Sequence, residues 1–162
     1  MAQATPKKLT RVMDGLFAHF QYEDLRVLVI EPDEDSRATL VRALGSLGLP
    51  WPSEAATAGE ALAMAADFEP ELLVCDATLD RPSGGDDGLE LLRRIRDDST
   101  TLAPDVPVIL LAEGEAGDFG VMEAKRLGVD GFLVKPVPTK RLQARLNAVI
   151  MRRFPDRVAW DV

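Results

Sequence analysis

The sequence predicts an α/β protein with a five-stranded parallel sheet and helices on both faces of that sheet. Short apolar runs, such as the β-branched run at 26–30 and the run at 72–76 that ends in Asp76, alternate with helical patterns of about ten residues. These runs are continuously apolar, which is typical of strands buried on both faces. Right-handed crossovers between parallel strands then leave few topologies open.

The composition narrows the class of protein. Of the 162 residues, 46% are hydrophobic and 28% are charged, and the net charge is −8. With no basic stripe to offset it, this charge argues against nucleic acid or an anionic membrane as a direct partner. One cysteine cannot form an internal disulfide, and no stretch has the length of a membrane span or the pattern of a secretory signal. We therefore expect a soluble cytoplasmic protein.

The segment 1–24 precedes the first predicted strand. Apolar residues fall at helical spacing within it, which predicts an amphipathic helix over about 9–20. Two roles stay open for this helix: packing on the domain that follows, or docking a partner or a second copy of the chain. His19 is the only histidine, so a metal site has no second imidazole to use, and we interpret it as an ordinary helix residue.

Five strands and five helices are expected to alternate along residues 25–151, which form one domain. The expected strands are 26–30, 51–57, 72–76, 105–111 and 131–134, and the expected helices are 36–47, 59–68, 88–97, 116–127 and 139–151. Glycine and proline end several of the helices, as at Gly48 and before Pro70. Residues 152–162 are expected to form a C-terminal tail without clear periodicity.

Charged residues fall at the carboxyl ends of three strands, where open parallel sheets bind their ligands. Glu31 and Asp33 follow the first strand, Asp76 ends the third, and Lys135 ends the fifth. Clustered carboxylates suit Mg²⁺, and a carboxylate can also accept a phosphoryl group whose charge a lysine balances. A set of ordinary strand-end charges is the weaker alternative, because four such positions share one edge of the sheet.

Residues 25–151 resemble a response-regulator receiver domain, the phosphoacceptor module of two-component signalling. The resemblance is carried by six stretches in order, at 27–33, 54–62, 72–76, 87–96, 107–111 and 128–136. It implies the flavodoxin-like strand order 2-1-3-4-5. It also implies a bacterial phosphorelay in which a histidine kinase or phosphotransfer protein donates the phosphoryl group.

The resemblance also implies roles for individual residues. Asp76 would be the phosphoacceptor, Lys135 would contact the phosphoryl group, and Phe132 takes the aromatic switch position. Lys135-Pro136 would be a cis peptide, and the usual interaction surface would include Phe132 and Lys140. The implied Mg²⁺ ligands are Glu31, Asp33, Asp76 and the backbone carbonyl of Thr78.

Four departures from the family pattern accompany these matches. Pro32 replaces the second acidic residue and cannot bind a metal through its side chain, which puts Mg²⁺ affinity in question. Ala112 replaces the switch Ser or Thr and lacks its hydroxyl, and Glu113 follows where a small residue is usual. The loop 77–87 is longer than usual and is interpreted as a lid, a docking surface or a plain solvated loop.

We therefore expect a stand-alone receiver that is phosphorylated on Asp76 and acts through protein contacts, since no output domain follows Met151. It would not be an enzyme beyond self-catalysed phosphoryl transfer and hydrolysis, and a homodimer is one arrangement open to it. The alternative is a degenerate receiver that binds proteins independently of phosphorylation. A true enzyme on this scaffold fits less well, because no Gly-rich phosphate loop follows the first strand. We interpret Cys75 as an inert buried residue.

Overall fold

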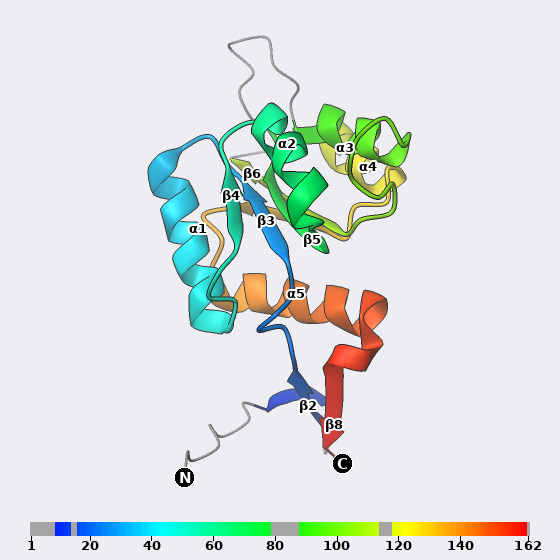
Figure 1. Ribbon diagram of the computed structural model, residues 1–162. Coiled ribbons are helices and arrows are strands. Elements are labelled where there is room, and N and C mark those ends of the chain that lie inside the picture. Colours follow the sequence, from blue (N-terminus) through cyan, green and yellow to red (C-terminus); the bar gives the residue numbers. More distant parts are fainter. Residues whose placement is uncertain (1–8, 14–15, 79–87, 114–117, 162) are drawn as a thin grey trace.

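The computed structural model describes residues 9–13, 16–78, 88–113 and 118–161. A five-stranded parallel sheet runs through the molecule in the order β4-β3-β5-β6-β7 (Figure 1). Its strands are β3 (Val27–Ile30), β4 (Ser53–Ala55), β5 (Leu72–Asp76), β6 (Val108–Glu113) and β7 (Gly131–Lys135). In order of appearance along the chain this is 2-1-3-4-5, so the predicted topology is confirmed.

In the part of the chain that the structure describes, five helices cover the two faces of this sheet (Figure 1). They are α1 (Glu34–Leu47), α2 (Ala58–Phe68), α3 (Gly88–Arg96), α4 (Asp118–Arg126) and α5 (Thr139–Arg153). The apolar residues of α1 and α5 share one core cluster with β3, β5 and β6, while those of α2, α3 and α4 form a second cluster on the other face. The predicted doubly wound layering is therefore present, and β3 and β5 are completely buried between its layers.

Local chemistry fixes where α1 begins and ends. The carboxylate of Asp33 accepts a hydrogen bond of 2.8 Å from the backbone N–H of Ser36 and so caps the first turn. The helix stops at Gly48, whose φ of 110° is a left-handed conformation that suits glycine. Asp33 therefore fixes the start of α1 close to the end of β3 at Ile30, and Gly48 fixes its end.

The predicted helix over 9–20 is wrong, because this segment forms two strands. These are β1 (Thr10–Met13) and β2 (Leu16–Phe20), and they pair in antiparallel fashion. The C-terminal tail, expected to lack regular structure, supplies a third strand, β8 (Val158–Asp161), after the short 3₁₀ helix η2 (Pro155–Arg157). The three strands form a separate sheet in the order β1-β2-β8, which lies below α5 in Figure 1.

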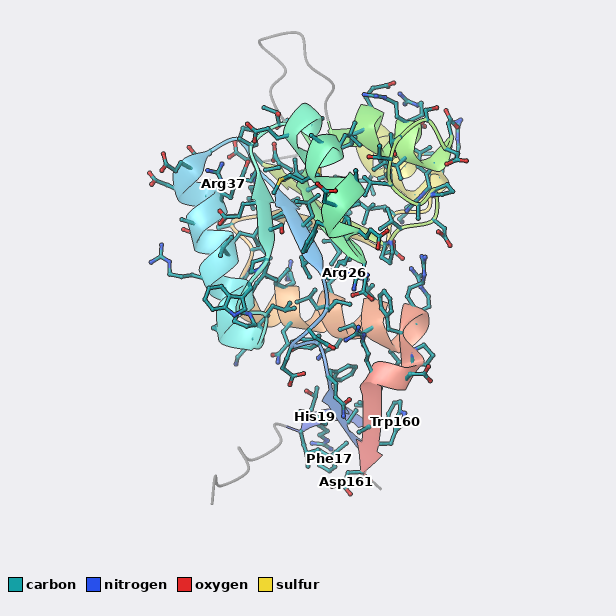
Figure 2. The ribbon with its side chains drawn as sticks, in the orientation of Figure 1. Phe17, His19, Arg26, Arg37, Trp160 and Asp161 are labelled. Atoms are coloured by element: carbon teal, nitrogen blue, oxygen red, sulfur yellow. The ribbon has the colours of Figure 1, made fainter. Side chains whose placement is uncertain are left out.

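The small sheet is anchored to the main core by alternate residues of β2. Ala18 and Phe20 are buried in the cluster beneath α1 and α5, whereas Phe17, which alternates with them along the strand, is exposed. Figure 2 shows Phe17 and Trp160 on the small sheet, away from the five-stranded one. The side chains of a strand alternate between its two faces, so the burial of this segment has a two-residue period, as expected for a strand and not for a helix.

Two further sequence predictions concern residues outside the described ranges. The long loop predicted at 77–87 falls almost entirely on residues 79–87, and the predicted start of the fourth core helix falls on residues 116–117. Among the helices that the structure describes, none combines the length and the apolar character that crossing a membrane requires.

Candidate functional site

Three strands bring their carboxyl ends to one edge of the main sheet. Ile30 at the end of β3 pairs with Cys75 in β5, so Glu31, which follows β3, and Asp76, which ends β5, lie side by side. Lys135 ends β7, and its register partner on β6 is Glu113. The fold therefore brings together Glu31, Asp76 and Lys135, as the sequence predicted.

The ammonium group of Lys135 links the two carboxylates. Its Nζ donates a hydrogen bond to Oε1 of Glu31 and another, 2.9 Å long, to Oδ1 of Asp76. The hydroxyl of Thr78 donates to the other oxygen, Oδ2, of Asp76 at 3.0 Å. Glu31 and Asp76 are only 4% and 5% exposed, so most of their charge is compensated by these contacts rather than by water.

The site shifts the pKa of two of these groups. Burial, together with the nearby charge of Asp76, raises the pKa of Glu31, although the hydrogen bond from Lys135 opposes that rise. Burial by itself lowers the pKa of Lys135, but the hydrogen bonds to Glu31 and Asp76 outweigh it and leave the pKa raised. Lys135 is therefore an ammonium ion at neutral pH.

Asp33 lies at this edge but serves another purpose. Its side chain caps α1, and the hydrogen bonds from Ser36 lower the pKa of its carboxyl. Pro32 offers no side-chain ligand, and Glu31 is held by Lys135. Within the described ranges no group of three or more His, Cys, Asp or Glu residues is arranged to hold a metal ion. The donor set present does not fit the predicted Mg²⁺ site, and the ligand roles of Glu31, Asp33, Asp76 and Thr78 stay predictions.

The two predicted switch positions lie on β6 and β7. Ala112 is buried near the end of β6, where its methyl group has no hydrogen bond to offer, and Val134 is its register partner. Phe132 is half-buried and packs against the core cluster on the α3 and α4 face. Glu113, the residue after Ala112, is exposed. The predicted Lys135-Pro136 cis peptide is present.

Two residues that the sequence did not single out support the site. Gly88 begins α3 directly against the end of β5, and a Cβ there would lie 2.3 Å from the carbonyl oxygen of Asp76. Arg37, on α1, donates to the backbone oxygen of Glu31 at 2.9 Å and to Glu54 at 3.3 Å; Figure 2 labels it. A glycine directly before a helical pattern was the available signal for Gly88, whereas Arg37 had none.

Comparison with known proteins gives a consistent result. Residues 27–147 match the family described as the response regulator receiver domain. The phosphate regulon transcriptional regulatory protein PhoB of Pseudomonas aeruginosa is 32% identical over 130 residues, which cover 80% of this chain and 53% of that protein. The response regulator MprA of Mycobacterium leprae is 32% identical over 139 residues, covering 85% of this chain and 56% of MprA. The chain thus matches about half the length of these relatives.

Solved structures share the fold. The signal receiver domain of a modulated diguanylate cyclase from Desulfovibrio desulfuricans G20 has a TM-score of 0.68 at 27% identity, covering 82% of this chain and 99% of that one. The chemotaxis protein CheY4 of Vibrio cholerae has a TM-score of 0.65 at 25% identity, covering 77% and 98%. Neither alignment reaches the whole chain.

Proposed function

The chain belongs to the response-regulator receiver family, and from this premise we propose that Asp76 accepts a phosphoryl group and that protein contacts transmit the result. The observation that carries the proposal is the contact between Lys135 and Asp76. The carboxylate stands at the carboxyl end of the central strand, and the ammonium group is within 2.9 Å of Oδ1. A cation so placed offsets charge on a phosphoryl group attached to that carboxylate.

The proposed step is a simple displacement. A carboxylate oxygen of Asp76 attacks the phosphorus of a phosphohistidine, a P–O bond forms, and the P–N bond breaks with its electron pair going to the imidazole. The product is an acyl phosphate on Asp76. Lys135 keeps its proton and contacts the transferred group, which requires that it exchange its present hydrogen bond to Asp76 Oδ1 for one to a phosphoryl oxygen.

Receiver domains bind Mg²⁺ at an acidic pocket, and this chain departs from that pattern. A bound Mg²⁺ supplies positive charge to the transferred phosphoryl group. Here Glu31 and Asp76 are both held by Lys135, and Pro32 stands where a ligand is expected. We therefore propose weak Mg²⁺ binding, and the displacement above relies on Lys135 alone.

Receiver domains interact with histidine kinases and with downstream effectors. We propose the same two classes of protein for this chain, and no further enzymatic activity. The surface of α4, β7 and α5 is a suitable contact region, because Met122 is 68% and Val134 46% exposed there. Cys75 is the single cysteine of the sequence, so the chain has no internal disulfide, which accords with the proposed location in a reducing cytoplasm.

Two observations favour a second candidate, a receiver that binds proteins without being phosphorylated. Ala112 lacks the hydroxyl that would form a hydrogen bond with the phosphoryl group, and Lys135 already donates a hydrogen bond to Glu31. In that case Asp76 and Lys135 are a structural ion pair, because a buried pair costs more to break than to keep.

The two candidates are distinguished by incubating the protein with acetyl phosphate at several Mg²⁺ concentrations and measuring its intact mass. The first predicts a gain of one phosphoryl group, absent from Asp76→Asn. The matched variant Pro32→Asp restores the second acidic position, and its mass gain should become faster as Mg²⁺ is added, whereas that of the natural chain should depend little on Mg²⁺. No mass gain in either the natural chain or Pro32→Asp would reject the phosphoacceptor and leave the binding module.

A further inference from the structure

A concave site lies next to Glu31 and Lys135, between α1, the end of β6 and the start of α5. It is a cavity of about 580 Å³, within the range of pockets that hold small organic ligands. Its apolar wall comes from three elements of the fold and from the loop before α5. That wall consists of Leu40, Ala43, Leu111, Pro136, Val137 and Leu142.

The polar part of this cavity is acidic. Asp35 stands in the first turn of α1 and Glu113 ends β6, and both are exposed. Neither forms an ion pair with another residue of the described ranges. Glu31 and Lys135 also reach the cavity, but they are bonded to each other, so Lys135 is already neutralised by Glu31 and by Asp76. Among the lining residues that the structure describes, the uncompensated charge is therefore negative.

The hydroxyl-bearing residues Ser36 and Thr39 line the same face of α1 as Asp35. Ser36 is half-buried and Thr39 exposed, so both side chains can exchange hydrogen bonds with a ligand as well as with water. An apolar chamber with acceptor groups along its rim matches an amphipathic molecule that has an apolar body and a protonated amine.

We propose that this cavity, referred to below as the α1–α5 cavity, binds small organic cations of that type. The apolar body lies against Leu40, Val137 and Leu142, and the ammonium group lies between Asp35 and Glu113. Such a ligand brings the positive charge that the rim lacks. Phosphorylation plays no part in the proposal, because Asp76 does not line the cavity.

The probe for a first test is phenethylamine, which carries a ring and a protonated amine. Binding is followed by two-dimensional NMR of the labelled chain, using the methyl groups of Leu40, Val137 and Leu142. Saturable shifts of these methyl signals at millimolar probe are expected, with 2-phenylethanol and 3-phenylpropionate as neutral and anionic comparisons. Both comparison compounds should bind more weakly than the amine.

Three variants assign the contacts. Glu113→Gln removes one rim charge at an exposed position and should weaken phenethylamine binding about two- to fivefold, as expected for a partly solvated ion pair. Ala43→Leu fills the chamber and should abolish binding. Ala38→Leu makes the same change on the exposed side of α1 and should leave binding unchanged.

The proposal is overturned if phenethylamine produces no saturable shift, or if 2-phenylethanol or 3-phenylpropionate binds as tightly. It is also overturned if Glu113→Gln leaves the affinity of the amine unchanged, since this exposed substitution does not threaten the fold. Because no phosphoryl donor is present, the outcome is independent of whether Asp76 is phosphorylated.

Discussion

Replacing Lys135 by methionine tests the arrangement at the strand ends most directly. The substitution keeps the length of the side chain but removes the ammonium group that bonds both Glu31 and Asp76. Two carboxylates that are 4% and 5% exposed then lose a common cation. Removing one partner of a buried ion pair costs about 3–5 kcal/mol, and the 17% exposure of the lysine side chain places this site at the lower end, about 3 kcal/mol.

Urea unfolding measures this loss. At an m-value of about 2 kcal/mol/M, a loss of about 3 kcal/mol lowers the midpoint by about 1.5 M. Lys140→Met is the matched control, because Lys140 is exposed at the start of α5, and its cost should stay within about 0.5 kcal/mol.

The loss should also depend on pH. Burial raises the pKa of Glu31 in the folded protein above its ordinary value of 4.5. At a pH above the folded pKa, the ionised carboxylate therefore lowers the stability of the fold. This loss of stability disappears once the pH falls below 4.5, because the carboxyl is then protonated in both the folded and the unfolded protein. Without Lys135 the loss is larger, and the gap between the natural chain and Lys135→Met should therefore narrow as the pH falls from neutral toward about 4. A loss below about 1 kcal/mol at neutral pH, or a gap that does not narrow in acid, would refute this reasoning.

Three other substitutions probe the framework around the site, each by urea unfolding. Gly88→Ala should cost about 2 kcal/mol, because its Cβ would meet the Asp76 carbonyl oxygen at 2.3 Å, and a neutral effect would contradict this. Phe20→Ala should cost about 3 kcal/mol in one cooperative transition, and an earlier separate transition of Trp160 fluorescence would show that the small sheet unfolds alone. Asp130→Asn should cost about 2 kcal/mol, because the buried carboxylate accepts a hydrogen bond of 2.9 Å from the backbone N–H of Val108 and pairs with Arg152 and Arg153. A loss under about 0.5 kcal/mol would mean that the amide replaces these contacts.

The five parallel strands could be predicted because their signal is local. Leu72–Asp76 and Val27–Ile30 are short apolar runs buried on both faces, and no distant partner is required to recognise them. The site followed from topology, since parallel strands place their carboxyl ends on one edge. Two details of the site could not be predicted: the oxygen atoms that Lys135 contacts, and the use of the Asp33 side chain to cap α1. Both depend on side-chain rotamers, which a sequence pattern does not contain.

The N-terminal hairpin was missed because its decisive partner is distant. The apolar residues of segment 9–20 match a helical spacing, yet Phe17 is exposed while Ala18 and Phe20 are buried, as in a strand. Strand β2 is held by β8, about 140 residues later, and pairing over such a separation leaves no mark in a local window. The dipeptide Asp14-Gly15, which lies outside the described residues, was the overlooked signal, because it is a frequent hairpin turn sequence.

The residues at the strand ends that match the family pattern differ in their effect on stability from those that depart from it. Asp76 is buried and Lys135 half-buried on strands of the central sheet. Replacing either one alone leaves an unpaired charge in the fold and lowers its stability. Pro32 and Ala112 carry no such penalty, because neither removes a partner from a buried ion pair. The contact between Lys135 and Asp76 supports a phosphoacceptor, but stability also retains the pair, so the contact does not separate the two candidates. The response of Pro32→Asp to Mg²⁺ and acetyl phosphate is the stronger criterion, because stability gives no reason for that response.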